Sequence, residues 1–352
     1  MHPGKIVCTL APQGRNSRNS EGAFLILGDR IRFIYSRFDA EDGHDDANAD
    51  IAEIVSRDGG ESWSAPRVLF RASDAGVKNL MSVSCLRLGE SEWGLFYLVR
   101  RGPEDTRLVL RRSGDGGETW GEPAYCMDDL GYHVVNNDRV IRLSSGRLLI
   151  PAAIHPVGAD SRYRVRHDPF DAFYLSDDNG YTWRQSKSLV SYFTPNNPAG
   201  LQEPGVVELP GGALWGYART ALGRHYEFFS YDGGESWTQA QPSQFTGPAS
   251  PLQIKRFPFD AKLLAVWNPV PNYQTRETFA GWGRTPLVYA VSEGGMDFSE
   301  PRVLENDPIR GFCYPAVAFL DAETVLLAYC AGGEEDHGCL NRCVIRKMSL
   351  KE

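Results

Sequence analysis

The chain has 352 residues, of which 42% are hydrophobic and 23% charged, and its formal net charge at pH 7 is −8. This negative balance argues against a nucleic-acid partner, because such proteins present clustered Lys and Arg residues. No run of about 18 apolar residues occurs, so we expect no membrane span. Residues 1–15 lack the apolar segment of a signal peptide. We therefore expect a cytoplasmic protein, unless a secretory signal has been trimmed.

The seven cysteines include no Cys-X-X-Cys pair. Cys339 and Cys343 form one short pair without a second pair elsewhere, so zinc is not expected. We expect reduced, mostly buried thiols, no metal site and no cofactor.

One short pattern recurs along the chain, with Asp and Gly in its centre and an aromatic residue at its end. It occurs at residues 56–63, 113–120, 176–183 and 230–237, and a shortened copy without the central Asp stands at 292–298. The closing aromatic residues are 57, 63, 54 and 61 positions apart. Repetition at this interval is typical of propellers and solenoids. Each copy fits a hairpin turn, because Asp accepts backbone N–H bonds and Gly supplies a positive φ.

Between the copies a pattern of three strands repeats, in which Val, Ile, Leu, Phe and Tyr are bounded by Gly, Pro, Asn and Asp. The predicted first strands cover 21–27, 82–88, 138–143, 204–209, 251–257 and 314–320. The second strands cover 30–38, 93–100, 147–155, 213–219, 263–270 and 324–331. The third strands cover 49–56, 107–113, 172–176, 225–230, 285–292 and 341–348. Helical periodicity is weak throughout, so the sequence predicts an all-β chain of six four-stranded antiparallel units.

The sixth unit has only three predicted strands, while the apolar segment 5–10 precedes the first unit and is otherwise unassigned. We expect segment 5–10 to pair with 341–348, because this pairing closes the ring and removes two exposed edges. The sequence therefore predicts one six-bladed β-propeller domain over residues 1–352.

The connections between the strands predict where a ligand site lies. In a four-stranded meander, the turns between the third and fourth strands all lie at one end, and these are the repeated motifs. Polar residues in the other connections then gather on the opposite rim, where loops on a rigid scaffold commonly carry function. These rim residues include Arg15, Arg18, Arg37, the acidic run 39–50, His133, Asn137, Glu203, Arg219, Arg284 and Tyr314.

Together these features resemble the sialidase (neuraminidase) superfamily over essentially the whole chain. The repeated motifs resemble its Asp boxes, which also occur in unrelated propellers and so indicate the fold alone. Residues 202–209 followed by 213–219 resemble the segment that carries a catalytic Glu and, one hairpin later, an Arg that binds the substrate carboxylate. Residues 313–320 followed by 326–329 resemble the segment that carries the nucleophilic Tyr.

The resemblance implies catalytic roles for three residues. Tyr314 is the nucleophile, Glu203 is its base, and an Asp of the loop after the second strand is the acid. Asp45 and Asp46 both fit that loop, and we prefer Asp46. A Tyr suits this reaction because the substrate carboxylate, borne on the anomeric carbon, would repel a carboxylate nucleophile.

Substrate-binding roles follow from the same resemblance. Arg219, Arg284 and either Arg15 or Arg18 would hold the substrate carboxylate, and we prefer Arg18 because it abuts the first strand. Further candidates on the same rim are Arg37, His133 and Asn137. His133 and Asn137 would read the sugar's substituents, or else belong to a buried polar network.

Two departures from the family pattern mark a divergent member. The usual Arg-Ile-Pro motif is replaced by Arg15-Asn-Ser-Arg18, and Tyr314 is followed by Pro where Ser is common.

We predict an exo-acting, retaining glycoside hydrolase that cleaves a terminal acidic sugar from a glycan. The alternatives are a hydrolase or lyase of the same fold that acts on another acidic sugar such as a uronate, and a glycan-binding propeller without turnover.

Overall fold

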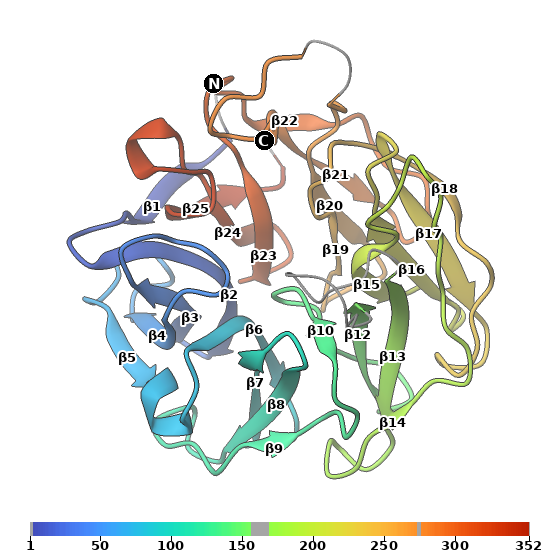
Figure 1. Cartoon of the computed structure of the whole chain (residues 1–352), viewed down its shortest axis with the longest axis horizontal. Helices are drawn as coiled ribbons and strands as arrows, with labels where there is room; N and C mark the ends of the chain where they lie inside the picture. Colours follow the sequence, from blue (N-terminus) through green and yellow to red (C-terminus); the bar gives the residue numbers. More distant parts are fainter. Residues whose placement is uncertain (1–2, 156–168, 273–275, 352) are drawn as a thin grey trace.

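The computed structural model describes residues 3–155, 169–272 and 276–351. They form a ring of six antiparallel blades around a central axis (Figure 1). Short runs of β-branched and aromatic residues build the strands, and polar turns rich in Gly, Asp and Asn separate them. In the described part of the chain, the helices are short 3-10 turns, η1 (Ala72–Ala75) and η2 (Glu334–Asp336), and none is long and apolar enough to span a bilayer.

Blades 1 to 3 follow the chain in order. Blade 1 consists of β2 (Asn16–Leu27), β3 (Arg30–Asp39), β4 (Ala49–Ser56) and β5 (Arg67–Phe70). Blade 2 consists of β6 (Asn79–Arg87), β7 (Trp93–Gly102), β8 (Asp105–Ser113) and β9 (Ala124–Tyr125). Blade 3 consists of β10 (Tyr132–Val134), β11 (Ile141–Arg142), β12 (Leu148–His155), β13 (Phe170–Ser176) and β14 (Arg184–Gln185). Parallel backbone pairs of Ala49 with Asn79 and of Thr106 with Tyr132 connect these three blades.

Blades 4 to 6 complete the ring. Blade 4 consists of β15 (Gln202–Glu208), β16 (Leu214–Arg219), β17 (Arg224–Ser230) and β18 (Gln241–Thr246). Blade 5 consists of β19 (Gln253–Arg256), β20 (Leu263–Trp267), β21 (Leu287–Ser292) and β22 (Arg302–Glu305). Blade 6 consists of β23 (Cys313–Phe319), β24 (Thr324–Cys330), β25 (Cys343–Ser349) and, as its outer strand, β1 (Lys5–Leu10).

The closure of the ring follows the prediction from the sequence. Strand β1 pairs antiparallel with β25, from Lys5 opposite Lys347 to Leu10 opposite Cys343. The outer edge of β25 is therefore covered by the beginning of the chain, as a closed propeller requires. The predicted six-bladed fold is confirmed.

One predicted strand differs from the structure. Within the first strand of blade 3, expected at 138–143, only the two-residue β11 forms. The other pairing partner of β12 on that side is β10, which precedes the expected range at Tyr132–Val134. Between β10 and β11, Asp138 adopts a φ of +57°, and its N–H donates to the carbonyl of Val83 in blade 2 at 2.9 Å. The segment therefore leaves its own sheet to bond with a neighbouring blade.

The repeated motifs are structural turns. In each of the four complete copies, the Ser hydroxyl lies 2.8 Å from the Asp carboxylate, to which it donates. The same hydroxyl accepts a hydrogen bond at 2.7–2.9 Å from the N–H of the Gly that stands four residues after the Ser in each copy. In the shortened copy, Ser292 instead donates to the carbonyl of Gly295 at 2.6 Å. The closing Trp fills the space between blades, as Trp237 does by stacking on Phe173 with 4.0 Å between ring centroids.

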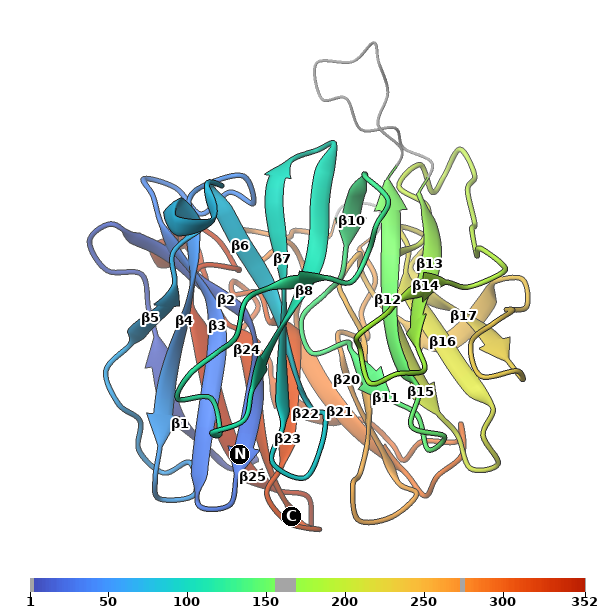
Figure 2. The ribbon, with the colours of Figure 1, turned by 90° about the horizontal axis from the view of Figure 1, so that it is seen from below.

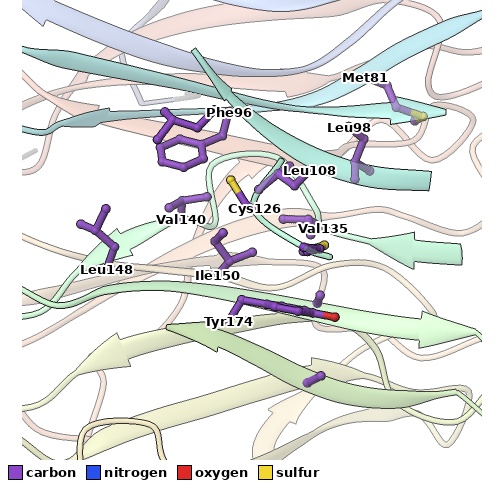
Figure 3. Close-up of a cluster of buried hydrophobic side chains, with 14 of the residues drawn as sticks. Met81, Phe96, Leu98, Leu108, Cys126, Val135, Val140, Leu148, Ile150 and Tyr174 are labelled. Atoms are coloured by element: carbon purple, nitrogen blue, oxygen red, sulfur yellow. The ribbon is translucent and has the colours of Figure 1, made fainter. Parts of the chain in front are cut away.

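Apolar clusters between neighbouring blades hold the ring together. Figure 3 shows the one between blades 2 and 3, where Phe96, Leu98 and Leu108 face Leu148 and Ile150. Each of these side chains is almost completely buried, and burial of one such side chain contributes about 1.5–3 kcal/mol. This packing makes the blades a rigid support for the loops at their ends.

The two faces of the ring carry different connections. In the side view of Figure 2, the turn between β7 and β8 lies at the upper edge, near β10. The box turn that follows β8 lies at the opposite end of that strand, because a strand crosses the ring from one face to the other. The candidate site lies on the side of the β7–β8 turn.

Candidate active site

A cavity of about 210 Å³ lies where blades 1, 2, 3, 4 and 6 meet. Its polar lining comprises Glu21, Asp45, Ser82, Arg100, Thr106, Tyr132, His133, Asn136, His155, Gln202, Glu203, Arg219 and Tyr314. A larger cavity of about 660 Å³ lies beside it, between residues 12–17, the 41–44 loop and residues 335–341. We assign the site to the smaller cavity, because there a possible nucleophile, a base and arginines converge.

A backbone feature shared by five blades positions the residues at the centre of the ring. A non-glycine residue with a φ between +51° and +59° stands near the start of the inner strand in each: Glu21, Ser82, Asp138, Glu203 and Tyr314. In four of these blades the strand pairing shifts register at that residue. Such bulges re-aim a side chain and are common beside active sites. All of these side chains except that of Asp138 line the cavity.

Tyr314 and Glu203 form a hydrogen-bonded pair across the cavity. The phenol of Tyr314 donates to Glu203 Oε1 at 2.7 Å. Burial and the neighbouring Glu203 charge raise the pKa of Tyr314 far above its usual value, while Arg219 and Arg284 act in the opposite direction. The resting phenol therefore keeps its proton and points it at the carboxylate that would remove it.

Arg219 lies on the other side of Glu203. Its Nη1 is 3.0 Å from Glu203 Oε2, while Nε and Nη2 donate to Gln202 Oε1 at 3.0 and 2.7 Å. Neither Nη1 nor Glu203 Oε2 makes an aligned hydrogen bond with a described residue. These two atoms are buried against each other, while the side chains of Arg219 and Glu203 both line the cavity. A guanidinium at a cavity wall is suited to bind an anionic group.

Arg18 is buried next to the cavity and is held by two carboxylates. It forms a short ion pair with Glu21, and its Nη1 donates to Asp45 Oδ1 at 2.6 Å and to the Gly43 carbonyl at 3.0 Å. Its Nε donates to the hydroxyl of Ser20 at 2.7 Å. Arg18 is therefore fully engaged by the protein, and the prediction that it grips a substrate carboxylate is not supported.

The two carboxylates that share Arg18 differ in their environment. Burial raises the pKa of Glu21 to about 7, against the pull of Arg18. The protein surrounds Asp45, which raises its pKa, but the outer part of this side chain stays in contact with water, and the charge and hydrogen bond of Arg18 prevail and lower the pKa of Asp45. Glu21 thus gains and loses its proton near neutral pH, whereas Asp45 is ionised there.

Arg284 lies behind Tyr314. Its guanidinium carbon is 5.5 Å from the centroid of the Tyr314 ring and 4.9 Å from that of Trp282. Its Nη1 lies 3.2 Å from Cys313 Sγ, its Nη2 donates to the Ala249 carbonyl at 3.2 Å, and its Nε has no partner among the described residues. Arg284 is thus close to the proposed nucleophile, as predicted, but it is almost completely buried.

The buried thiol of Cys313 belongs to a cluster with Cys330 and Cys339. Burial opposes ionisation of Cys313, but hydrogen bonds from Cys330 and Cys339 and the charge of Arg284 together lower its pKa.

In the part of the chain that the structure describes, no group of three or more His, Cys, Asp or Glu residues is arranged to hold a metal ion.

Other predicted residues lie elsewhere. The preference for Asp46 over Asp45 needs correction, because Asp46 is exposed and does not line the cavity, whereas Asp45 does. Arg15 is exposed and pairs with Asp39 on the surface at 3.3 Å, so it is not the site arginine. Arg37 does not line the cavity either.

His133 and Asn137 were expected either to contact the sugar's substituents or to belong to a buried polar network. The structure places both in such a network. His133 has its Nδ1 2.9 Å from the Thr106 carbonyl and its Nε2 3.0 Å from both Asp129 and the Tyr174 hydroxyl. Asn137 donates to the carbonyl of Tyr314 at 3.3 Å and to that of Gly22 at 2.9 Å. Asn137 therefore supports the backbone that presents Tyr314.

Glu21, Ser82 and Tyr132 line the cavity but were not expected there from the sequence. A usable signal existed for Glu21. The inner strands align as Glu21-Gly-Ala, Glu203-Pro-Gly and Tyr314-Pro-Ala, so Glu21 stands where two other blades carry a candidate catalytic residue.

The six-bladed ring and its Asp boxes define a propeller of the sialidase type. Residues 34–325 match the BNR repeat-like domain, and the chain belongs to this family. Sialidase-4 of Homo sapiens is 26% identical over 235 residues, which cover 60% of this chain and 47% of that protein. The chain thus matches less than half the length of this curated relative.

Solved structures share the fold at low sequence identity. A Dyadobacter fermentans protein of unknown function superposes with a TM-score of 0.73 at 18% identity, covering 98% of this chain and 99% of its own. The intramolecular trans-sialidase from Ruminococcus gnavus, in complex with oseltamivir carboxylate, superposes with a TM-score of 0.71 at 14% identity, covering 99% of this chain and 98% of its own. At these identities the likeness concerns the fold alone.

Proposed function

We propose that this protein is an exo-acting, retaining glycoside hydrolase that removes a terminal acidic sugar from a glycan. The observation that carries the proposal is the Tyr314–Glu203 hydrogen bond of 2.7 Å inside a cavity, with Arg219 against Glu203. A cavity of about 210 Å³ is small for a ligand site, which favours a single terminal sugar over an extended chain and so supports exo cleavage. The relatedness to sialidases supports the same substrate class.

The chemistry runs in two steps. In the first, Glu203 takes the phenolic proton as Tyr314 Oη attacks the anomeric carbon, and the bond to the leaving oxygen breaks with its electron pair. A cavity carboxyl protonates that oxygen as it leaves. In the second step, a water activated by the same carboxyl group replaces Tyr314, which regains its proton from Glu203. Two inversions at one carbon give retention.

The substrate's carboxylate is matched by positive charge beside the nucleophile. Arg219 lines the cavity, and Arg284 lies against the Tyr314 ring. Guanidinium groups bind carboxylates through charge-assisted, often bidentate hydrogen bonds. A substrate carboxylate at Arg219 would place the anomeric carbon next to Tyr314. Arg284 does not line the cavity and would act through its charge beside the Tyr314 ring.

Turnover of a fluorogenic sialoside and of a panel of acidic glycosides tests the proposal. Tyr314→Phe and Glu203→Gln are expected to stay folded and to lose about 10²-fold or more in kcat, as is usual when an acid–base or nucleophilic group is removed. Tyr181→Phe, an exposed Tyr on a box turn, serves as the matched control. Wild-type turnover in Tyr314→Phe would refute the assignment of the nucleophile. The anomer released first, observed by NMR, reports retention.

A second candidate is action on another acidic sugar, such as a uronate, by hydrolysis or elimination. The observation that favours it is the engagement of Arg18 by Glu21 and Asp45 together with the burial of Arg284. Of the three arginines predicted to hold the carboxylate, Arg219 alone lines the cavity. Unsaturated uronate products, detected by their ultraviolet absorbance, would identify elimination. Binding of an acidic glycan without any product would indicate a lectin-like role instead.

A further inference from the structure

We propose that Glu21 is the carboxyl group that protonates the leaving oxygen and later activates water, in place of an aspartate of the 42–46 loop. This role rests on the proposed glycosidase function and adds a catalytic residue to it. Three observations support it, namely the position of Glu21 in the ring, the charge balance around Arg18, and the contact of Glu21 with Ser82.

Glu21 occupies on blade 1 the position that Glu203 occupies on blade 4 and Tyr314 on blade 6. Each stands at a bulge of the inner strand with a φ near +50°, namely +54°, +51° and +55°. All three side chains line the same cavity. A left-handed conformation costs a non-glycine residue about 1–3 kcal/mol, and such strain clusters at active sites. Glu21 therefore faces the substrate from the blade next to that of the nucleophile.

The charges around Arg18 favour a proton on Glu21. One guanidinium bonds two carboxylates, so full ionisation would leave a net negative charge beside the cavity. The side chain of Glu21 is 5% exposed and that of Asp45 is 57% exposed, so water stabilises the charge on Asp45 much better. Among the described residues, three other titratable groups face Glu21, namely Glu203, Tyr314 and Tyr132. Burial chiefly, and to a smaller extent the charge of Glu21, raises the pKa of each of these two tyrosines. A negative Glu203 likewise disfavours ionisation of Glu21.

The pKa values agree with this charge balance. Burial raises the pKa of Glu21 to about 7, whereas Arg18 outweighs burial and lowers the pKa of Asp45. A general acid works best with a pKa near the working pH, because it must hold a proton and also release it. Asp45 is ionised at neutral pH and has no proton to give.

The two oxygens of Glu21 have different partners. Oε1 is fixed by Arg18, while Oε2 lies 2.5 Å from the hydroxyl of Ser82, which also lines the cavity. The Ser82 hydroxyl donates to the ionised carboxylate, and it can rotate to accept when Glu21 is protonated. Because Arg18 occupies Oε1, we place the proton of the acid form on Oε2, from which it passes to the leaving oxygen as the electron pair of the broken C–O bond moves onto that oxygen. Arg18 stabilises the carboxylate that remains and positions it for the second step.

The test compares Glu21→Gln with Asp45→Asn on two glycosides of one acidic sugar, one with an aryl leaving group and one with a sugar leaving group. For Glu21→Gln we expect a loss of about 10²–10⁴-fold in kcat on the sugar glycoside. On the aryl glycoside we expect a burst of one equivalent of phenol, followed by slow turnover that added azide accelerates, because an activated leaving group needs no acid. Asp74→Asn, an exposed carboxylate on η1, is the matched control with wild-type kinetics.

The proposal would be overturned if Asp45→Asn showed the burst and the azide rescue while Glu21→Gln kept the leaving-group dependence of the wild type. That result would leave the glycosidase function intact. Absence of turnover by the wild-type enzyme on every acidic glycoside would overturn both. A substrate-free readout separates these cases. Infrared titration should detect a protonated carboxyl group that ionises near pH 7 in the wild type and is missing from Glu21→Gln, and absence of that signal in the wild type would contradict the proposal.

Discussion

The buried carboxyl of Glu21 makes the stability of the fold depend on pH in a direction opposite to that of most carboxylates. Its pKa is about 7 in the folded protein and 4.5 in a free side chain, so between these values the folded state binds a proton that the unfolded chain has lost. The stability that this proton provides is complete below about pH 4.5 and is lost as pH rises through 7. The pKa difference of about 2.5 units corresponds to about 3 kcal/mol.

Glu21→Gln isolates this contribution. The amide cannot titrate, yet its oxygen can still accept from Arg18 and its nitrogen can donate to Ser82 Oγ, which lies 2.5 Å from the native Oε2. We expect the free energy of unfolding of the wild type to fall by about 3 kcal/mol relative to the variant between pH 4.5 and 7.5. Titrating groups that do not interact with Glu21, such as the buried His225, contribute equally to both proteins and cancel in the difference. Asp45 and Glu203 interact with the charge of Glu21, so their shifts are part of the measured effect.

Urea unfolding at half-unit pH intervals, followed by Trp fluorescence, measures this difference. The slopes against urea should agree between the two proteins, so that midpoints report stability directly. Parallel pH curves for the wild type and Glu21→Gln would show that Glu21 has an ordinary pKa. A difference that grows toward low pH instead would show that Arg18 keeps Glu21 ionised, and either result would refute the charge-balance argument.

Two further predictions concern the ring itself. Ser113→Ala removes the hydroxyl that bonds both the Asp and the Gly of its box, and should cost about 1–2 kcal/mol in urea unfolding without changing activity. Arg346→Met removes a buried cation that donates to Glu305 at 2.6 Å and to Tyr329 at 2.9 Å, and should lower the free energy of unfolding by about 3 kcal/mol because Glu305 loses its counter-charge. The double variant Arg346→Met with Glu305→Gln should recover part of that loss, and no recovery would argue against a charge effect.

The repeat made most of the fold predictable. Each box fixes the end of a third strand, and the apolar runs within the 54–63 residues between successive boxes then locate the other strands of the blade. The pairing of β1 with β25 was also predictable, because β1 was the one apolar segment that the repeat left unassigned. The interruption in the first strand of blade 3 was not predictable in this way. Asp138 N–H donates to the Val83 carbonyl of another blade, and a local sequence pattern does not contain that contact.

The candidate site was predictable only where a short segment carried the information. Tyr314, Glu203 and Arg219 stand in compact motifs, and they do line one cavity. The choice between Asp45 and Asp46 depended on how the loop folds over Arg18, which the sequence does not reveal. The engagement of Arg18 by two carboxylates was invisible for the same reason, because those partners are 3 and 27 positions away along the chain.

The left-handed residues around the axis connect fold and function, and this connection can be tested through stability. Glycine adopts a positive φ without strain, whereas an alanine there pays about 1–2 kcal/mol. At Glu203 and Tyr314, with φ of +51° and +55°, the Gly variant should therefore unfold at higher urea concentration than the Ala variant, by about 1 kcal/mol. Under the proposed mechanism both variants are expected to be inactive. At an ordinary strand position, such as Val207, the order should reverse, because glycine destabilises a strand. Equal stability of the Gly and Ala variants at both sites would mean that the backbone relaxes freely. The ring would then not hold these side chains in place, and the argument that their shared conformation aims them at one substrate would fail.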